Sequence, residues 1–315
     1  MPWNDIWQAD MNESGLLPLI KKDRNNEIDD SKGYLIVDLN PYDHSKRDGD
    51  PEKNREVNVL TNVHIKKKTS YNLIEKLLDN YIATANKSEN FDPKEIDEIK
   101  EFLKYAINTK PMQIAKKYIE NNYDIIDNNT SDDEWMKKLY DIWFEPRRNG
   151  STSVFEHVFV GEQSSHTDTV LDGHHFWYNY YLHDGPYEVT HYEDTIYFLR
   201  YVQVESHEKS NYAEVITISY DYTEKNQDDQ TGLKLHKETG GFFVGLSAEG
   251  LLAIGTIAYF MALPKNSDRC GDIKKDISIT INEETYNLRV ILKCDEGKTF
   301  FRTFYPMIVK TRRHH

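Results

Sequence analysis

The sequence predicts an α+β fold, in which a helical N-terminal region packs on a region of antiparallel β-sheets with short helices. Between residues 69 and 145 the apolar side chains recur every three or four positions, which is the spacing of a helix. After the polar stretch PRRNGS (146–151), apolar and polar residues alternate with the period of two that strands show. We therefore expect a helical region over 1–148 and a β-rich region over 149–311, together forming one domain.

The first half of the chain begins with a polar segment and continues with a clear helical stripe. Residues 1–65 are rich in Asp, Asn and Lys and have few periodic stretches, so we expect them to wrap a core rather than to form one. In residues 69–85 the spacing of the apolar residues predicts an amphipathic helix whose buried face meets that core. The side chains on this face are Ile74, Leu77, Leu78, Tyr81 and Ile82.

The start of the next helix is the best-defined boundary in the sequence. Asp92 can cap a helix N-terminus, Pro93 fits its first position, and Glu95 completes a capping box. Two shorter helices are predicted over 111–123 and 132–145. In the second of these, apolar residues step by four along one face: Trp135, Leu139 and Trp143.

The second half of the chain predicts several strands and one short helix. Residues 171–182, LDGHHFWYNYYL, favour a helix that Asp172 caps and that carries His175, Tyr178 and Leu182 on one face. Alternating stretches predict strands at 151–160, 193–205 and 213–222, and two more near 277–293 and 299–309.

Charge and composition restrict the partners of this protein. The 315 residues carry a formal net charge of −14, so the molecule as a whole repels polyanions, and any contact with nucleic acid needs a local cationic site. The longest apolar run, 251–263, is shorter than the ~20 residues that span a bilayer. No signal peptide is visible at the N-terminus. The sequence favours a cytoplasmic monomer without membrane contact, or a secreted protein whose signal was removed.

The cysteines leave the compartment open. Cys270 and Cys294 are the two cysteines of the chain, and they lack the spacing of metal ligands. A single disulfide and two free thiols fit the sequence equally well. Dinucleotide-binding and phosphate-binding glycine motifs are absent from the sequence, so we expect no organic cofactor.

Histidine is concentrated in one part of the sequence. Seven of the 12 histidines lie between residues 157 and 207, and histidine is the side chain best suited to proton transfer near neutral pH. A single histidine in a strand is more often a structural residue than a catalyst. A zinc site is the second alternative, but the sequence has neither an HExxH nor a CxxC motif. Signatures of nucleophilic hydrolases such as GxSxG are also missing.

Four short blocks give the histidines a context. They are FEHVFVGE (155–162), GHHFW (173–177), HKETGGFFVG (236–245) and RTFYP (302–306). Together they resemble the EndoU (XendoU-like) family of poly(U)-specific endoribonucleases, and the resemblance extends over roughly residues 5–310. The sequence departs from the family pattern at Phe176, where the family commonly has Asn, and at Gly240-Gly241, where a serine often occurs.

The resemblance implies a reaction and a set of site residues. The family cleaves single-stranded RNA at uridines by attack of the 2′-OH on the adjacent phosphorus, which leaves a 2′,3′-cyclic phosphate and a 5′-OH. On this chain it implies His175 as general base, His157 as general acid and Lys237 as the cation that stabilises the phosphate. The base must be neutral and the acid protonated, so opposed pKa shifts are expected.

Further residues of the four blocks are expected to bind the nucleotide. Thr303 and Tyr305 would line the nucleotide site, the first through its hydroxyl and the second by stacking or bonding near the ribose. The backbone N–H groups of Gly240 and Gly241 would contribute to substrate placement. The pair His174-His175 leaves an ambiguity about which imidazole acts, and the glycine before it and the spacing of 18 from His157 favour His175.

Two acidic residues beside the first histidine are harder to interpret. In a strand, Glu156 would point to the face opposite His157 and would not hold that imidazole. A structural ion pair is one interpretation of Glu156 and Glu162. Members of the family that respond to manganese or calcium suggest a supporting or metal-linked role, in which the two carboxylates contribute to a Mn²⁺ or Ca²⁺ site. They can also tune the histidines through their charge.

Two other classes of function remain open. The altered second histidine block and the charge of −14 also fit an RNA-binding or regulatory protein that keeps the fold but cleaves weakly or not at all. A histidine-rich metal-binding protein is the third interpretation.

Overall fold

The N-terminal half contains helices and a small sheet. The computed structural model describes residues 1–21, 28–29, 31–41, 58–79, 81, 92–146, 152–164, 167–184, 196–198, 206, 211–226, 229–264, 271–295 and 297–309. Helix α1 (Trp3–Glu13) is followed by strands β1 (Leu17–Ile20), β2 (Tyr34–Val37) and β3 (Leu60–His64), with β1 and β2 parallel and β3 antiparallel to β2. Helices α2 (Lys68–Leu78), α3 (Pro93–Ala106), α4 (Lys110–Asn122) and α5 (Asp132–Trp143) come next.

The C-terminal half is organised around two three-stranded antiparallel sheets. A π-helical turn, η4 (Glu156–Val160), leads into the short pair β4 (Glu162–Gln163) and β5 (Leu171–Asp172), and then into α6 (Trp177–Asp184). One sheet is formed by β6 (Ile196–Phe198), β7 (Val215–Asn226) and β8 (Asp229–Phe243). After α8 (Ala248–Ala262) the other is formed by β9 (Ile273–Ile281), β10 (Glu284–Asp295) and β11 (Lys298–Ile308).

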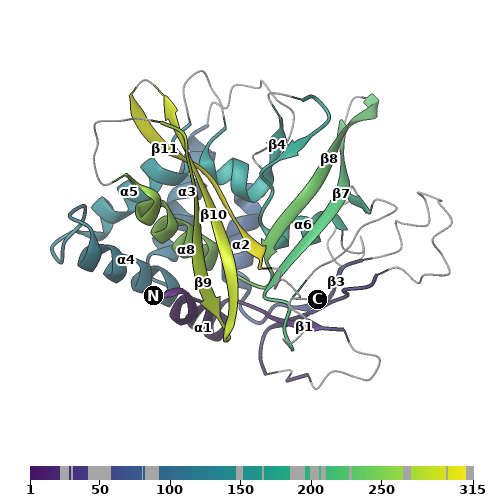
Figure 1. Ribbon diagram of the computed structural model, residues 1–315, viewed down its shortest axis with the longest axis horizontal. Coiled ribbons are helices and arrows are strands. Elements are labelled where there is room, and N and C mark those ends of the chain that lie inside the picture. The colour runs from purple at the N-terminus through teal and green to yellow at the C-terminus, as the bar shows by residue number, and fades with distance from the viewer. Residues whose placement is uncertain are drawn as a thin grey trace, which may run out of the picture.

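These elements share one hydrophobic core. In Figure 1 the helices α4 and α5 lie on the left, the β7–β8 hairpin lies on the right, and the β9–β10–β11 sheet lies between them. Helix α8, from the C-terminal half, packs on α1, α2 and α4, and strand β11 also contacts β7 and β8. The α+β class is therefore confirmed. The division at residue 148 stays a prediction, and buried side chains on both sides of it form one continuous cluster.

Several predicted elements are confirmed. Helix α3 has the capping box, because the Asp92 side chain accepts from the N–H of Glu95 and the Glu95 side chain accepts from the N–H of Asp92. Trp135, Leu139 and Trp143 of α5 are all buried. Strand β7 matches the prediction for 213–222. Helix α2 ends at Leu78, and Ile82 and most of the predicted strand 193–205 lie outside the described residues.

Some predictions were wrong. Residues 1–65 do contribute to the core, since Trp3 and Trp7 on α1 are each 1% exposed. The stretch 277–293 belongs to two strands, because the chain turns at Asn282 and Glu283, which both have positive φ. Asp172 lies in β5 instead of capping a helix, and α6 begins at Trp177.

The predicted strand 151–160 is a helical turn. The five residues of η4, Glu156–Val160, are all buried, and Phe159 packs against Trp143 on one side and Phe176 on another. A turn that is covered on every side shows no polar stripe, so its periodicity cannot be read from the sequence. Because π-turns are rare and often occur at functional sites, this correction concerns the part of the chain that carries His157.

The described residues bear on two further expectations, the absence of a membrane-spanning helix and the state of the cysteines. Over the described parts of the chain, no helix combines the length and the apolar character that a membrane crossing needs. Cys294 on β10 is disulfide-bonded. Cys270 lies outside the described residues.

Candidate functional site

Main-chain hydrogen bonds join the two histidine blocks. The N–H of His174 donates to the carbonyl of His157 at 2.9 Å, and the N–H of His175 donates to the carbonyl of Val158 at 2.7 Å. Gly173 has a φ of +67°, and a Cβ at this position would lie 1.8 Å from the His157 carbonyl oxygen. Only glycine fits so close to η4. The glycine of the second block is therefore what allows the two histidine-bearing segments to approach.

The structure separates the roles of His174 and His175. His174 is fully buried, its Nδ1 is hydrogen-bonded to the Tyr220 hydroxyl, and its ring meets Phe242 edge-on. The ring of His175 instead stacks on Tyr305 with 4.7 Å between the centroids. Its Nδ1 lies 3.3 Å from the Gly241 carbonyl, which can only accept, so Nδ1 carries the proton and Nε2 is left as the basic nitrogen. Among the ring contacts and hydrogen bonds of the described residues, the His175 side chain meets the predicted site residue Tyr305, whereas that of His174 meets Tyr220 and Phe242.

His157 is oriented by Glu162. The Nδ1 atom of His157 lies 3.0 Å from Oε1 of Glu162, and both residues are buried. A carboxylate accepts the Nδ1 proton and leaves Nε2 as the second reactive nitrogen, which is how such pairs fix an imidazole. The predicted supporting position of Glu162 is thus next to His157. Glu156, in contrast, is buried in the first turn of η4, where the argument based on opposite strand faces does not apply.

Arg302 is a residue that the sequence interpretation missed. Its guanidinium forms an ion pair with the same Glu162 oxygen that binds His157. Arg302 precedes Thr303 in the fourth block, so its position was visible, but 140 residues separate it from Glu162 and nothing in the sequence pairs them. The result is a His157–Glu162–Arg302 cluster at the junction of η4, β4 and β11, in which the first two residues are buried and Arg302 is partly exposed.

Lys237 extends from β8 toward the Leu171–Gly173 segment, which carries the glycine of the second histidine block. Its ammonium group donates to the Gly173 carbonyl at 2.5 Å and to the Leu171 carbonyl at 3.3 Å, and the residue is 7% exposed. An ammonium group has three donors, so one N–H is left for another acceptor. His157, His175 and Lys237 are thus gathered around Gly173.

The expected nucleotide-binding residues lie on β11 and β8, which pack against each other. Thr303 is buried, and its hydroxyl has no hydrogen-bond partner within the described part of the chain. Tyr305 covers the His175 ring. Gly240 and Gly241 pair with Ile218 and Thr217 of β7, and Gly241 also lies against Tyr305 and Pro306 of β11.

The two glycines provide a matched pair of variants. A Cβ on Gly241 would lie 2.3 Å from the Pro306 carbonyl oxygen, so Gly241→Ala must push β11 and Tyr305 away from His175. A Cβ on Gly240 would come no closer than 3.3 Å, to a ring atom of Tyr220. For the RNA cleavage that the resemblance implies, we expect Gly241→Ala to lower kcat/KM by on the order of 10²-fold, since small misplacements in a site cost that much. Gly240→Ala should lose less than about tenfold. Equal losses of kcat/KM in the two variants would contradict the close approach of Gly241, and not of Gly240, to β11.

Burial dominates the electrostatics of the site. It lowers the pKa of His157 to about 4, and the charge of Arg302 adds to this effect while Glu162 opposes it. Burial and the charge of Lys237 place the pKa of His175 well below its ordinary value. Burial also lowers the pKa of Lys237 to about 8. The expectation of opposed histidine pKa shifts was therefore wrong for the free protein, because both imidazoles are buried beside cations.

The carboxylates of the site do not fit a resident divalent ion. Over the residues the structure describes, no group of three or more His, Cys, Asp or Glu side chains could hold a metal. Burial would raise the pKa of Glu162, but its hydrogen bond with His157 and the charges of His157 and Arg302 outweigh this and lower it. A guanidinium on the carboxylate competes with a cation for its oxygens. The Mn²⁺ or Ca²⁺ expectation stays a prediction that these residues do not support.

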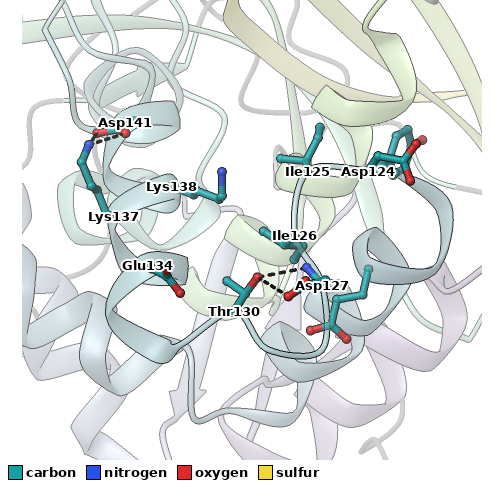
Figure 2. A pocket seen from close by; sticks show the side chains of 11 residues that line it. Asp124, Ile125, Ile126, Asp127, Thr130, Glu134, Lys137, Lys138 and Asp141 are labelled. Atoms are coloured by element: carbon teal, nitrogen blue, oxygen red, sulfur yellow. Dashed lines mark hydrogen bonds and ion pairs between the residues drawn. The ribbon is translucent and has the colours of Figure 1, made fainter.

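A pocket of about 710 Å³ lies elsewhere, beside the loop between α4 and α5. Figure 2 shows Asp124, Asp127, Glu134 and Asp141 around it, with Lys137 paired to Asp141. None of the predicted site residues lines it. An acidic depression of this kind repels a polyanion, so it does not compete with the histidine site as a place for RNA.

Comparisons with known proteins found a family model, curated relatives and a solved structure. The family model described as Endoribonuclease XendoU matches residues 16–306. The chain is 24% identical to poly(U)-specific endoribonuclease-B of Xenopus laevis, over 98% of this chain and 93% of that protein. It is 29% identical to uridylate-specific endoribonuclease B of Danio rerio, over 63% of this chain and 65% of the relative. The solved structure of XendoU, a splicing-independent snoRNA-processing endoribonuclease, superimposes with a TM-score of 0.62 at 22% identity and covers 98% of this chain and 95% of its own.

Proposed function

Because the chain belongs to the XendoU endoribonuclease family, we propose that it cleaves single-stranded RNA at uridines. The products would be a 2′,3′-cyclic phosphate and a 5′-OH. The observation that carries this proposal is the convergence of His157, His175 and Lys237 on the Gly173 turn. Two imidazoles and an ammonium supply a base, an acid and a cation, which is what transesterification of a phosphodiester needs.

The proposed steps assign one task to each side chain. Nε2 of His175 takes the proton of the 2′-OH as the oxygen attacks phosphorus, which is consistent with a buried imidazole that is neutral at pH 7. His157 donates a proton from Nε2 to the departing 5′-oxygen. The remaining N–H of Lys237 stabilises the negative charge that develops on the phosphate oxygens. Thr303 and Tyr305 bind the uridine nucleotide next to His175.

His157 needs the substrate in order to become an acid. Its pKa of about 4 leaves it neutral in the free protein at pH 7. A phosphodiester anion beside it favours the imidazolium and raises the pKa. The pH profile of kcat/KM reports pKa values of the free enzyme, and the pH profile of kcat reports those of the enzyme–substrate complex. We therefore expect the alkaline limb of kcat/KM to lie at lower pH than the alkaline limb of kcat.

The Glu162–Arg302 pair allows a test in which two variants should shift the pH profile of kcat/KM in opposite directions. Glu162 raises the pKa of His157, so Glu162→Gln should move the alkaline limb of kcat/KM to lower pH. Arg302 lowers that pKa, so Arg302→Gln should move the limb to higher pH. Lys298→Gln, on the exposed start of β11, is the control for loss of charge and should leave the limb in place. Shifts of the same sign in both variants would exclude His157 as the group that sets this limb.

The direct test uses two oligonucleotides that differ by one oxygen. One contains a single uridine in a non-uridine single strand, and the other has 2′-deoxyuridine at that position. We expect cleavage of the first alone, with a cyclic phosphate detected by mass spectrometry. Cleavage of the deoxy substrate would exclude this mechanism, and binding without a product would favour an RNA-binding protein of this fold. Parallel reactions with EDTA, Mn²⁺ or Ca²⁺ test the metal prediction.

A further inference from the structure

A row of polar side chains crosses the β9–β10–β11 sheet at the level of Tyr305. Strand pairing places Arg289 of β10 opposite Tyr305 and Asp276 of β9 opposite Arg289. Directly opposite residues on neighbouring strands have Cβ atoms about 5 Å apart, so their side chains meet. The neighbours Val290 and Phe304 are fully buried on the other face. The row therefore lies on the face that carries the histidine site, away from the core.

Arg289 is held rigidly within this row. Its Nε and Nη2 atoms donate to the two carboxylate oxygens of Asp276, each at 2.8 Å. This two-point geometry fixes the plane of the guanidinium. The hydrogen bonds with Asp276 raise the pKa of Arg289 above its ordinary value, and the neighbouring Tyr305 side chain adds to this shift. The fork of donors thus binds the exposed Asp276 carboxylate on one side, and the strand register places Tyr305 on the other side of Arg289.

The position of Arg289 opposite Tyr305 sets the direction of a hydrogen bond between their side chains. A guanidinium can only donate, so in such a bond the Tyr305 oxygen accepts and the hydroxyl keeps its own proton for a different acceptor. The ring is fixed at the same time by its stacking on His175, with 20° between the planes. Tyr305 therefore lies between Arg289, which is opposite it on β10, and His175, which stacks on its ring.

We propose that Arg289 is a positioning residue of the nucleotide site, which aims the Tyr305 O–H at an oxygen of the bound uridine nucleotide. The assignment rests on the proposed function. Arg289 contacts neither His157 nor Lys237 in the hydrogen bonds of the described residues, so its effect on cleavage passes through Tyr305. Asp276 acts one step further away, by fixing the guanidinium.

A double-mutant cycle tests this dependence. Arg289→Met in the wild-type background should lower kcat/KM for the single-uridine oligonucleotide by about tenfold, the value of one hydrogen bond that involves a charged group. In the Tyr305→Phe background the same substitution should cost less than about twofold, since the hydroxyl that it orients is gone. Arg289→Lys keeps the charge but not the fork, and it should resemble Arg289→Met.

Control variants distinguish positioning from a direct phosphate contact and from a loss of folding. Lys293→Met removes a cation that pairs with Asp272 at 2.5 Å and should leave kcat/KM unchanged. Thermal unfolding shows whether each variant is folded. Equal losses in both backgrounds, or full activity of Arg289→Lys, overturn the positioning role and identify Arg289 as an independent phosphate contact.

A binding measurement separates the failure of this role from the failure of the proposed function. The cycle is repeated as Kd for the 2′-deoxyuridine oligonucleotide. If wild type cleaves one oligonucleotide and binds the other, only the Arg289 assignment is at risk. If it does neither, the proposed function fails and this role fails with it.

Discussion

Replacement of His175 by alanine is expected to lower kcat for uridine cleavage by about 10²–10⁴-fold, the usual contribution of one acid–base group. The expectation follows from its position. Its ring stacks on Tyr305, its Nδ1 is bonded to the Gly241 carbonyl, and its Nε2 is the basic nitrogen. KM should change little, because the imidazole acts on the proton in the transition state. Single-turnover kinetics on the single-uridine oligonucleotide measures the loss in the chemical step.

Two other histidines serve as controls for this variant. His174→Ala should mainly reduce stability, since the side chain is fully buried and bonded to Tyr220. His236→Ala should leave both activity and stability nearly unchanged, because this side chain is 40% exposed and pairs with Asp221 on the strand surface. If His174→Ala lost kcat with unchanged stability while His175→Ala remained active, the assignment of the two neighbours would be reversed.

Replacement of Lys237 by methionine is expected to lower kcat by about 10²–10³-fold, similar to the loss of one preorganised donor at a developing anion. The lysine must be protonated to do this work. Its pKa of about 8 means that this contribution should fade in the free enzyme as the pH rises through 8. Lys234→Met, three residues earlier on the same strand, is the control and should retain activity.

Lys237 also offers a readout that does not depend on RNA. Its pKa in the folded protein is lower than in the unfolded chain, so above pH 8 the unfolded state binds more protons than the folded state. The free energy of unfolding of wild type should therefore rise, relative to that of Lys237→Met, between pH 8 and about 10.5. Urea unfolding at pH 7 and pH 9.5 measures the difference. A constant difference would mean that the lysine is not buried as the structure has it.

The sequence predicted the elements whose signals are local. Helix α3 carries its capping box within four residues, and α5 repeats its apolar side chains every four positions, so both can be placed from their own residues alone. Helix α1 could not, because the acidic and amide residues around Trp3 and Trp7 hide a short apolar stripe. The turn η4 was misread as a strand, since neighbours bury it on all sides.

The same distinction applies to the site. His157, His175 and Lys237 were identified through a resemblance, and the structure gathers them around Gly173. The supporting contacts depend on pairs that are far apart in the sequence, such as Glu162 with Arg302. The charge state of the histidines was mispredicted for a related reason: burial beside Lys237 and Arg302 is a property of the folded protein alone.

The contact of α1 with α8 has a consequence for synthesis on the ribosome. Asp10 on α1 is fully buried and accepts hydrogen bonds from Ser247, which lies 237 residues later in the chain. Helix α1 also packs on α4 of the N-terminal half, but its contacts with α8 and β9 become possible only when the C-terminal half has emerged. At about 5–20 residues per second, the part of α1 that contacts α8 and β9 stays uncovered in the nascent chain for about ten seconds or more. The nascent chain therefore offers a binding site for chaperones that the finished enzyme lacks.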